Sequence, residues 1–186
     1  GTIQNLEAIG KICKERGVLF HTDACQSFTK VPIDIKKQNL DLVTLNAHKI
    51  HGPKGVGALY IRSGIKIVPL AHGGGHEKKL RSGTENIPGI VGFAKAVDIA
   101  SDKDVKKMEK LRDMIIDGLL KIDNVKLNGP RGDNHVLKAI GLPPLQSNSS
   151  LRISISKYTT EEDVKYFLEK IQKIVKKLRA ISPLIR

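Results

Sequence analysis

The chain has 186 residues, of which 40% are hydrophobic and 27% are charged. This composition is typical of a globular protein, and the length suffices for one domain or for one domain and part of another. No apolar run is long enough to cross a bilayer and no signal peptide opens the chain, so we expect no membrane partner.

The net charge and the cysteine content limit the possible partners and the location of the protein. A formal net charge of +13 would suit a nucleic-acid-binding protein, but aromatic residues make up only 4% and no arginine-rich or stacking motif is present. The lysines are scattered along amphipathic helices. We therefore expect weak attraction to polyanions or acidic partners and no specific nucleic acid. Two cysteines, Cys13 and Cys25, give no disulfide framework and indicate a reducing, cytoplasmic location.

A helix is predicted over residues 5–16. Apolar side chains recur there on one face, and Gly17 stands where a C-terminal glycine is expected. The members of this face are Leu6, Ile9, Ile12 and Cys13. Cys13 is therefore interpreted as a small buried hydrophobic residue and not as a nucleophile.

A strand over residues 18–20 is expected to follow, with polar side chains at its carboxyl end. These side chains are His21, Asp23 and Gln26. Ligands bind at such strand ends in open α/β sheets. An aspartate in this position more often caps a turn, so Asp23 alone would not indicate a functional site. Cys25 is given no catalytic role.

The central stretch of the chain is residues 46–57, which join two apolar runs. The runs, residues 42–45 and 58–61, are predicted to be strands of a packed sheet. Lys49 would then lie at a strand end, away from the open surface. Loss of solvation disfavours the charged form of a lysine and leaves an amine that can attack a carbonyl and form a Schiff base. His48 could donate to an anion, and the glycines would let the backbone approach a ligand closely.

A third polar block, residues 72–86, is rich in glycine. His72, His76 and Glu77 are of types that bind metals. The three glycines between the histidines would make a flexible and costly ligand scaffold, and no pattern of supporting residues is visible. No metal site is therefore predicted.

The rest of the chain is predicted to be mainly helical. The first apolar helical face comprises Val105, Met108, Leu111, Ile115 and Leu119. Residues 135–142 are read as a further helix, and residues 151–156 alternate as a half-buried strand. A capping box at residues 159–162 is expected to start the last helix. The predicted buried stripe of that helix comprises Val164, Phe167, Ile171, Ile174 and Leu178.

Three of these blocks resemble motifs of the cysteine desulfurases, a pyridoxal-phosphate family among the class-V aminotransferases. The first is His-x-Asp-Ala-x-Gln at residues 21–26, and the second is His-Lys-x-x-Gly-Pro-Lys-Gly at residues 48–55. The third, in the glycine-rich block, is Gly-Gly-Gly-x-Glu followed by Arg-Ser-Gly-Thr-x-Asn. The motifs occur in the family's order and are specific in combination.

The resemblance implies pyridoxal 5'-phosphate as the cofactor and gives roles to the central residues. Lys49 would hold the cofactor covalently and then work as acid and base. Asp23 would pair with the protonated pyridine nitrogen, and Gln26 would donate to the phenolic oxygen. His48 belongs to the same implied site. Asn46 replaces a serine that holds the cofactor phosphate in the family, and its amide can still donate there.

Two residues outside this cluster also receive roles from the resemblance. Thr84 would reach across a subunit interface to the phosphate of the neighbouring cofactor, which implies a homodimer. Arg152 would clamp the α-carboxylate of the substrate with its planar guanidinium, although an arginine in an alternating strand is usually only solvent-facing. Arg81 could equally be structural.

The implied fold is α/β and of fold type I, with a mixed, mostly parallel sheet. Residues 1–95 would form part of the cofactor-binding large domain, and residues 96–186 would belong to a smaller α+β domain. Family members have a long portion before the segment that matches Gly1. They also have a strand and a loop with the sulfur-accepting cysteine where Asn134 meets His135 here. We therefore expect segments of a longer chain, with that cysteine outside the 186 residues.

The implied reaction converts L-cysteine to L-alanine. Sulfur would pass through a cysteine persulfide to an acceptor such as an iron-sulfur scaffold or a tRNA-thiolation protein. Two alternatives stay open: a related enzyme, such as a selenocysteine lyase or a small-molecule aminotransferase, and a non-catalytic fragment that binds a partner. The third motif favours a desulfurase over the related enzymes.

Overall fold

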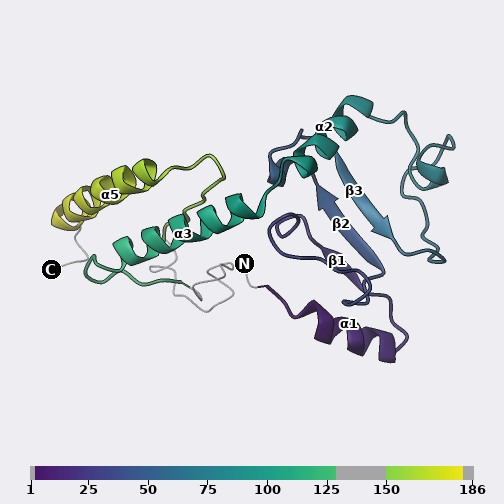
Figure 1. The fold of residues 1–186 in the computed structure, drawn as a ribbon, viewed down its shortest axis with the longest axis horizontal. Coiled ribbons are helices and arrows are strands. Elements are labelled where there is room, and N and C mark those ends of the chain that lie inside the picture. Colours follow the sequence, from purple (N-terminus) through teal and green to yellow (C-terminus); the bar gives the residue numbers. More distant parts are fainter. Residues whose placement is uncertain (1–2, 129–149, 182–186) are drawn as a thin grey trace. The chain divides into compact units, whose positions relative to one another are not determined.

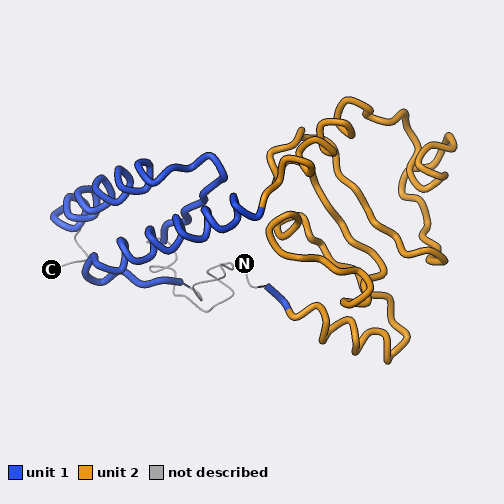
Figure 2. The backbone as a smooth tube through the Cα atoms, in the orientation of Figure 1, with its two compact units in different colours: residues 1–4, 102–186 blue, residues 5–101 orange. Residues whose placement is uncertain are grey.

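Two compact units make up the chain in the computed structural model, which describes residues 3–128 and 150–181. One unit comprises residues 5–101, and the other comprises residues 1–4 and 102–186, as coloured in Figure 2. Each unit has an apolar core of its own, with two buried clusters in residues 5–101 and one in the helical unit.

A three-stranded sheet forms the centre of the unit of residues 5–101 (Figure 1). Its strands are β1 (His21–Asp23), β2 (Leu42–Asn46) and β3 (Gly57–Ile61), in the order β1-β2-β3. β1 runs parallel to β2 with Asp23 opposite Thr44, and β3 runs antiparallel to β2. The predicted mixed sheet is confirmed, and the second and third strands lie where the sequence predicted them.

The first strand begins later than the sequence predicted. Val18 and Leu19 are exposed and belong to no strand. Pairing starts at Phe20, whose carbonyl accepts the N–H groups of Asp41 and Leu42. The prediction for residues 18–20 was therefore wrong, because apolar character does not show where a partner backbone begins.

Asp41 stabilises the beginning of the sheet through a hydrogen bond and an ion pair. It is only 8% exposed, and its Oδ2 accepts the N–H of Phe20 at 2.7 Å. Its Oδ1 forms an ion pair of 3.3 Å with Arg62, directly after β3, and Arg62 also donates to the carbonyl of Leu40. These bonds join the starts of β1 and β2 to the end of β3.

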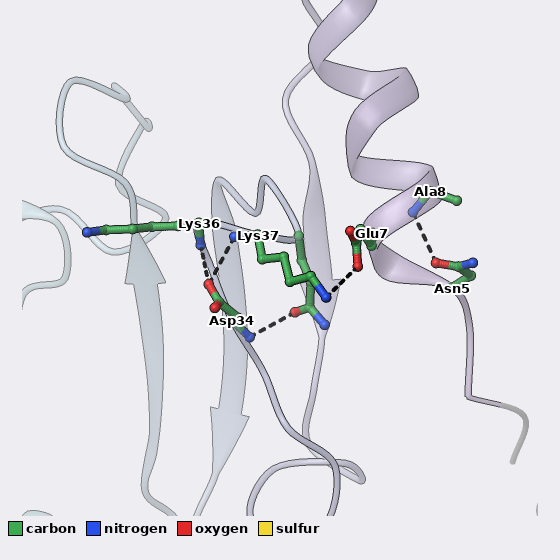
Figure 3. A network of polar contacts seen from close by, with 7 residues as sticks. Asn5, Glu7, Ala8, Asp34, Lys36 and Lys37 are labelled. Carbon is green, nitrogen blue, oxygen red and sulfur yellow. Dashed lines mark hydrogen bonds and ion pairs between the residues drawn. The ribbon is translucent and has the colours of Figure 1, made fainter.

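Helix α1 (Leu6–Glu15) confirms the first predicted helix. It begins at Asn5, whose side chain accepts the N–H of Ala8 at 3.0 Å. Gly17 follows the helix with a left-handed φ of 62°. An ion pair of 3.0 Å between Glu7 and Lys37 ties the first turn of α1 to the turn after Asp34 (Figure 3).

The apolar face of α1 is only partly covered. Ile9 and Ile12 are exposed, and Cys13 is half-buried. The prediction that Cys13 is buried was therefore wrong. The helix contacts Gln38 at its buried Gly10, and this small contact leaves the neighbouring apolar side chains outside it.

Helix α2 (Ile87–Asp98) lies at the end of the sheet where β2 finishes (Figure 1). Its Phe93 and Ala96 are buried in one cluster with Ala47 and Ile50, which follow β2. The ring of Phe28 meets Phe93 edge to face, with 6.3 Å between the centroids. α2 therefore supports the segment that leaves β2.

The second unit is helical in the part that is described. Helices α3 (Asp102–Leu119) and α5 (Glu161–Ile181) pack together through buried Leu111, Ile115 and Val164. Both helices were predicted. None of the helices in the described ranges has both the length and the apolar character that crossing a bilayer requires.

Residues 151–156 do not form the predicted strand. Ile153 and Ile155 alternate inward as expected and pack against the cluster of α3 and α5. A strand also needs a neighbouring backbone to bond, and the described part of this unit contains no strand. The predicted helix at residues 135–142 and the junction of Asn134 with His135 lie outside the described residues.

The start and the stripe of α5 differ in detail from the prediction. The capping box is formed by Thr160 and Asp163, each of which accepts the other's backbone N–H, one residue later than predicted. Val164 is buried, whereas Ile174 and Leu178 are exposed. The stripe is therefore covered only where α3 lies against it.

Candidate functional site

The carboxyl ends of β1 and β2 carry the residues of the first two motifs. Asp23 is the last residue of β1, and Asn46 is the last residue of β2. A single 3-10 turn, η1 (His48–Ile50), follows β2 at once and carries Lys49. Because β1 and β2 are parallel neighbours, Asp23 and Lys49 lie at the same edge of the sheet. Open α/β sheets bind ligands at this edge.

Asp23 is an ionised carboxylate that also caps a turn. Its Oδ1 accepts the backbone N–H of Cys25 at 2.9 Å. Hydrogen bonds from the Cys25 thiol and from the Cys25 backbone lower the pKa of Asp23, and His21 lowers it further. The turn-capping role considered for Asp23 is thus present, and the exposed carboxylate has further acceptor capacity for a ligand.

Cys25 lies beside Asp23 as a protonated thiol. Burial, followed by the hydrogen bond to the Asp23 carboxylate, raises the pKa of Cys25. A thiolate, and not a thiol, is the nucleophilic form of cysteine. This environment gives no support to a nucleophilic role for Cys25.

His21 reinforces the pairing of β1 with β2. Its Nε2 lies 2.8 Å from the Thr44 hydroxyl oxygen, across the two strands. The backbone N–H of Ala24 donates to the Thr44 carbonyl at 2.9 Å. These bonds hold the end of β1 in register with β2 and fix where Asp23 stands.

Asn46 caps the turn that carries Lys49. Its Oδ1 accepts the backbone N–H of Lys49 at 3.1 Å. The side-chain oxygen is therefore engaged, and the NH₂ group, which bonds the side chain of Cys25, is the group that could donate to a phosphate. Phosphate binding by Asn46 stays a prediction.

Lys49 is exposed in this chain, as are His48 and Gln26. The prediction that Lys49 lies away from the open surface was wrong. The short turn η1 directs Ile50 inward, where it is 5% exposed against α2, and leaves Lys49 on the outer side. Desolvation of its amine would need further structure to cover it.

Gly52, three residues after Lys49, and Gly92 in α2 serve packing within the protein. A Cβ on Gly52 would lie 2.9 Å from the Cβ of Ala47 and 3.2 Å from that of Ala96 in α2. A Cβ on Gly92 of α2 would lie 2.6 Å from Cγ of Pro53. The sequence suggested that the glycines near Lys49 admit a ligand. In the structure, the absence of a side chain at Gly52 allows α2 to pack closely against this segment.

The glycine-rich block stands apart from Asp23 and Lys49. Thr84 is exposed, and no hydrogen bond between described residues joins the block to those two side chains. Its internal bonds include one of 3.0 Å from the Ser82 hydroxyl to the Gly74 carbonyl, and Arg81 donates to the carbonyl of Ser82. Arg81 thus has a structural contact, and the role of Thr84 stays a prediction.

Two further predictions concern a metal and the substrate. Within the described ranges, no group of three or more His, Cys, Asp or Glu side chains is placed to hold a metal ion. Arg152 is exposed and belongs to the helical unit. Its clamp on a carboxylate stays a prediction.

Lys30 was not predicted from the sequence as a site residue. Its Nζ lies 3.3 Å from the carbonyl oxygen of Lys49 and 3.2 Å from that of Gln26. Lys30 precedes Lys49 by 19 residues and occupies an ordinary turn, so no local signal could have identified this contact.

The site can be compared with known proteins. The cysteine desulfurase IscS of Methanosarcina thermophila is 42% identical over 229 residues, which cover 99% of this chain and 57% of that protein. Cysteine desulfurase IscS of Clostridium botulinum (strain Hall) is 39% identical, over 99% of this chain and 58% of that protein. Both alignments are longer than the 186 residues here, so these relatives carry extra residues within the aligned span.

Solved structures give the same result. A NifS-like protein is similar with a TM-score of 0.85 and 38% identity, over 95% of this chain and 58% of that one. A NifS-like protein from Rickettsia africae has a TM-score of 0.82 and 32% identity, over 95% of this chain and 59% of that one. The chain thus spans under three fifths of the length of these relatives. The aminotransferase class-V family model matches residues 1–142. The chain therefore belongs to the class-V aminotransferases, pyridoxal-phosphate enzymes of fold type I.

Proposed function

We propose that the protein to which these 186 residues belong is a pyridoxal-phosphate-dependent cysteine desulfurase. The observation that carries the proposal is the placement of Asp23 and Lys49 at the carboxyl ends of neighbouring parallel strands. The two relatives compared above, at 42% and 39% identity, are both named cysteine desulfurase, which supports this choice of reaction. When bound, pyridoxal phosphate supplies an electron sink that stabilises negative charge on the α-carbon of an amino acid.

The side chains at this edge fit such a cofactor. The ionised carboxylate of Asp23 suits a protonated pyridine nitrogen, and the amine of Lys49 can bind the cofactor's aldehyde carbon. The NH₂ group of Asn46 and the ring of His48 would donate to the phosphate, and Gln26 would donate to the phenolic oxygen. Lys49 would also move the substrate's α-proton, as the resemblance to the desulfurases implies for the lysine that holds the cofactor.

The substrate and partners follow from the resemblance. L-Cysteine would bind with its α-carboxylate on Arg152 and would leave as L-alanine. The sulfur would go to an acceptor protein such as an iron-sulfur scaffold. Thr84 would serve the site of a second copy in a homodimer. We place the protein in the cytoplasm, with residues 1–95 in the cofactor-binding domain and residues 96–186 in the smaller one.

Mapping the attachment point tests the cofactor site. The intact protein is incubated with pyridoxal phosphate, reduced with borohydride and digested, and the modified peptide is identified by mass spectrometry. The pyridoxyl group should be found on Lys49 and should be lost in Lys49→Ala. Modification of Lys54 in place of Lys49 would refute the assignment.

A product assay tests the reaction. L-Cysteine should yield L-alanine and sulfide in equal amounts when a reducing thiol is present. Release of selenide from L-selenocysteine alone, or transfer of the amino group to an oxo acid, would favour a related enzyme. A colourless protein whose intact mass corresponds to 186 residues would favour the non-catalytic fragment.

A further inference from the structure

Lys30 bridges the two segments that carry the candidate site. It lies in a series of tight turns that begins at Ala24, directly after β1. Its half-buried side chain donates from Nζ to the Gln26 carbonyl at 3.2 Å and to the Lys49 carbonyl at 3.3 Å. One ammonium group therefore holds the main chain on both sides of the site.

The Lys49 carbonyl is a group that η1 leaves without a partner. The last carbonyls of a helical turn have no donor within the turn. At His51 the chain leaves η1 in a left-handed conformation, with a φ of 66°. Lys30 supplies the donor at this end, and Asn46 accepts the Lys49 N–H at the other. Both polar main-chain groups of Lys49 are thus bound by side chains, which fixes the peptide planes around its Cα.

The surroundings of Lys30 show that this bridge is costly to form. Burial lowers the pKa of the Lys30 ammonium, and the charge of Lys49 lowers it further. Its two acceptors are neutral carbonyls, and none of the ion pairs between described residues includes Lys30. The repulsion between the two lysines is therefore a further cost of the bridge.

We propose that Lys30 is a positioning residue for Lys49, and that its bridge between the Gln26 and Lys49 carbonyls directs the Lys49 amine toward the aldehyde of pyridoxal phosphate. The inference rests on the proposed attachment of the cofactor to Lys49. Attachment forms a bond between the Lys49 nitrogen and the aldehyde carbon and releases one water. Lys30 touches neither of these atoms and acts through the main chain.

The rate of cofactor attachment tests this role. Intact, cofactor-free protein is mixed with pyridoxal phosphate, and modification of Lys49 is followed by absorbance and by borohydride reduction with peptide mapping. Lys30→Met removes both hydrogen bonds but keeps the apolar stem. Its attachment rate should fall on the order of tenfold, as for a small misplacement of a reacting group. Lys30→Arg keeps a cation with several donors and should restore most of the rate.

Controls separate positioning from folding. Lys66→Met removes an exposed lysine beyond β3 and should attach the cofactor at the wild-type rate. If Lys30→Met does not fold, Lys30→Gln takes its place. Gln keeps a polar group at this position but is too short to reach both carbonyls, so the same loss is expected. The melting temperature of each variant is measured beside its rate.

The outcomes are distinct. Equal attachment rates in wild type, Lys30→Met and Lys30→Gln would overturn the positioning role alone. Equal losses in Lys30→Met and Lys30→Arg, each with a lowered melting temperature, would assign Lys30 to fold stability and also overturn it. A wild-type protein that never attaches the cofactor at Lys49 would overturn the proposed function together with this inference.

Discussion

The segment around Lys49 and the glycine-rich block both match motifs of the same family, yet the rest of the fold supports them very differently. The turn η1 is held by Asn46 and Lys30 through hydrogen bonds and by Ile50 through burial against α2. The glycine-rich block contains η2 (Glu77–Lys79), in which three consecutive non-glycine residues have left-handed φ values of 45°, 55° and 66°. Each such residue is strained by about 1–2 kcal/mol.

The first segment is held in place by residues of this chain, whereas the second has few such contacts. Buried side chains and cross-segment hydrogen bonds fix η1 within the unit of residues 5–101. The glycine-rich block has mostly local bonds and exposed side chains, and Leu70, two residues before it, is 99% exposed. We therefore expect a further surface to stabilise this block, as the proposed place of Thr84 at a subunit interface would require.

The largest expected effect on stability comes from truncating Ile50, the buried residue that follows Lys49. Ile50→Ala should lower the free energy of unfolding by about 2–5 kcal/mol, because it leaves a cavity in a packed cluster. Leu70→Ala is the matched change in the exposed segment and should stay within about 0.5 kcal/mol. Urea denaturation of the intact protein measures both. Similar losses in the two variants would contradict the contrast between the segments.

Asp23→Asn tests whether the charge of Asp23, at the same sheet edge as Lys49, takes part in the reaction. The amide oxygen can still accept the Cys25 N–H, so the turn should survive and the unfolding midpoint should stay near that of wild type. The negative charge is lost, and turnover of L-cysteine should fall by about 10²–10³-fold, as for removal of one strong electrostatic contact. Near-normal turnover would refute the pairing of Asp23 with the cofactor.

Thr84→Val tests whether the exposed block completes the site of another subunit. Loss of a hydrogen bond to a charged group costs about 1.5–3 kcal/mol, so pyridoxal phosphate should bind roughly tenfold to a hundredfold more weakly. In mixed dimers of Lys49→Ala and Thr84→Val copies, the one intact lysine would meet an intact Thr84 from its partner and bind normally. Weak binding in these mixed dimers, or a monomer that binds tightly by itself, would contradict the prediction.

The smallest effect concerns backbone strain in η2. Lys78 has a φ of 55° and a ψ of 35°. Lys78→Gly removes strain of about 1–2 kcal/mol but loses about 0.5–1 kcal/mol to the greater freedom of unfolded glycine. The free energy of unfolding should therefore rise by up to about 1.5 kcal/mol. Lys11→Gly in α1 is the control and should destabilise by about 1 kcal/mol, because its backbone is right-handed. A loss of stability in both variants would show that the left-handed turn is unstrained.

Sequence periodicity was sufficient for α1, α3, α5, β2 and β3, because each of these elements has a clear apolar pattern. It placed β1 too early, since Val18 and Leu19 are apolar but Asp41 and Leu42 determine where pairing begins. It also predicted a strand at residues 151–156, where the burial alternates but no strand forms.

The motif residues at the sheet edge could be identified from sequence because their spacing is local. The surroundings of these residues could not be identified from the sequence. The exposure of Lys49 depends on which elements cover it, and the contact with Lys30 spans 19 residues without any pattern. The close approach of α2 likewise depends on Gly92, which carries no signal until Pro53 is known to lie against it.

The contact between Gly92 and Pro53 makes the position of Lys49 sensitive to single methyl groups on a helix that bears no ligand-binding side chain. Any residue larger than glycine at position 92 would have to move Pro53 or lift α2, and α2 also holds Ile50 through Phe93 and Ala96. Laboratory evolution for altered lysine reactivity would therefore find useful substitutions on the buried face of α2 as readily as among residues that face the cofactor.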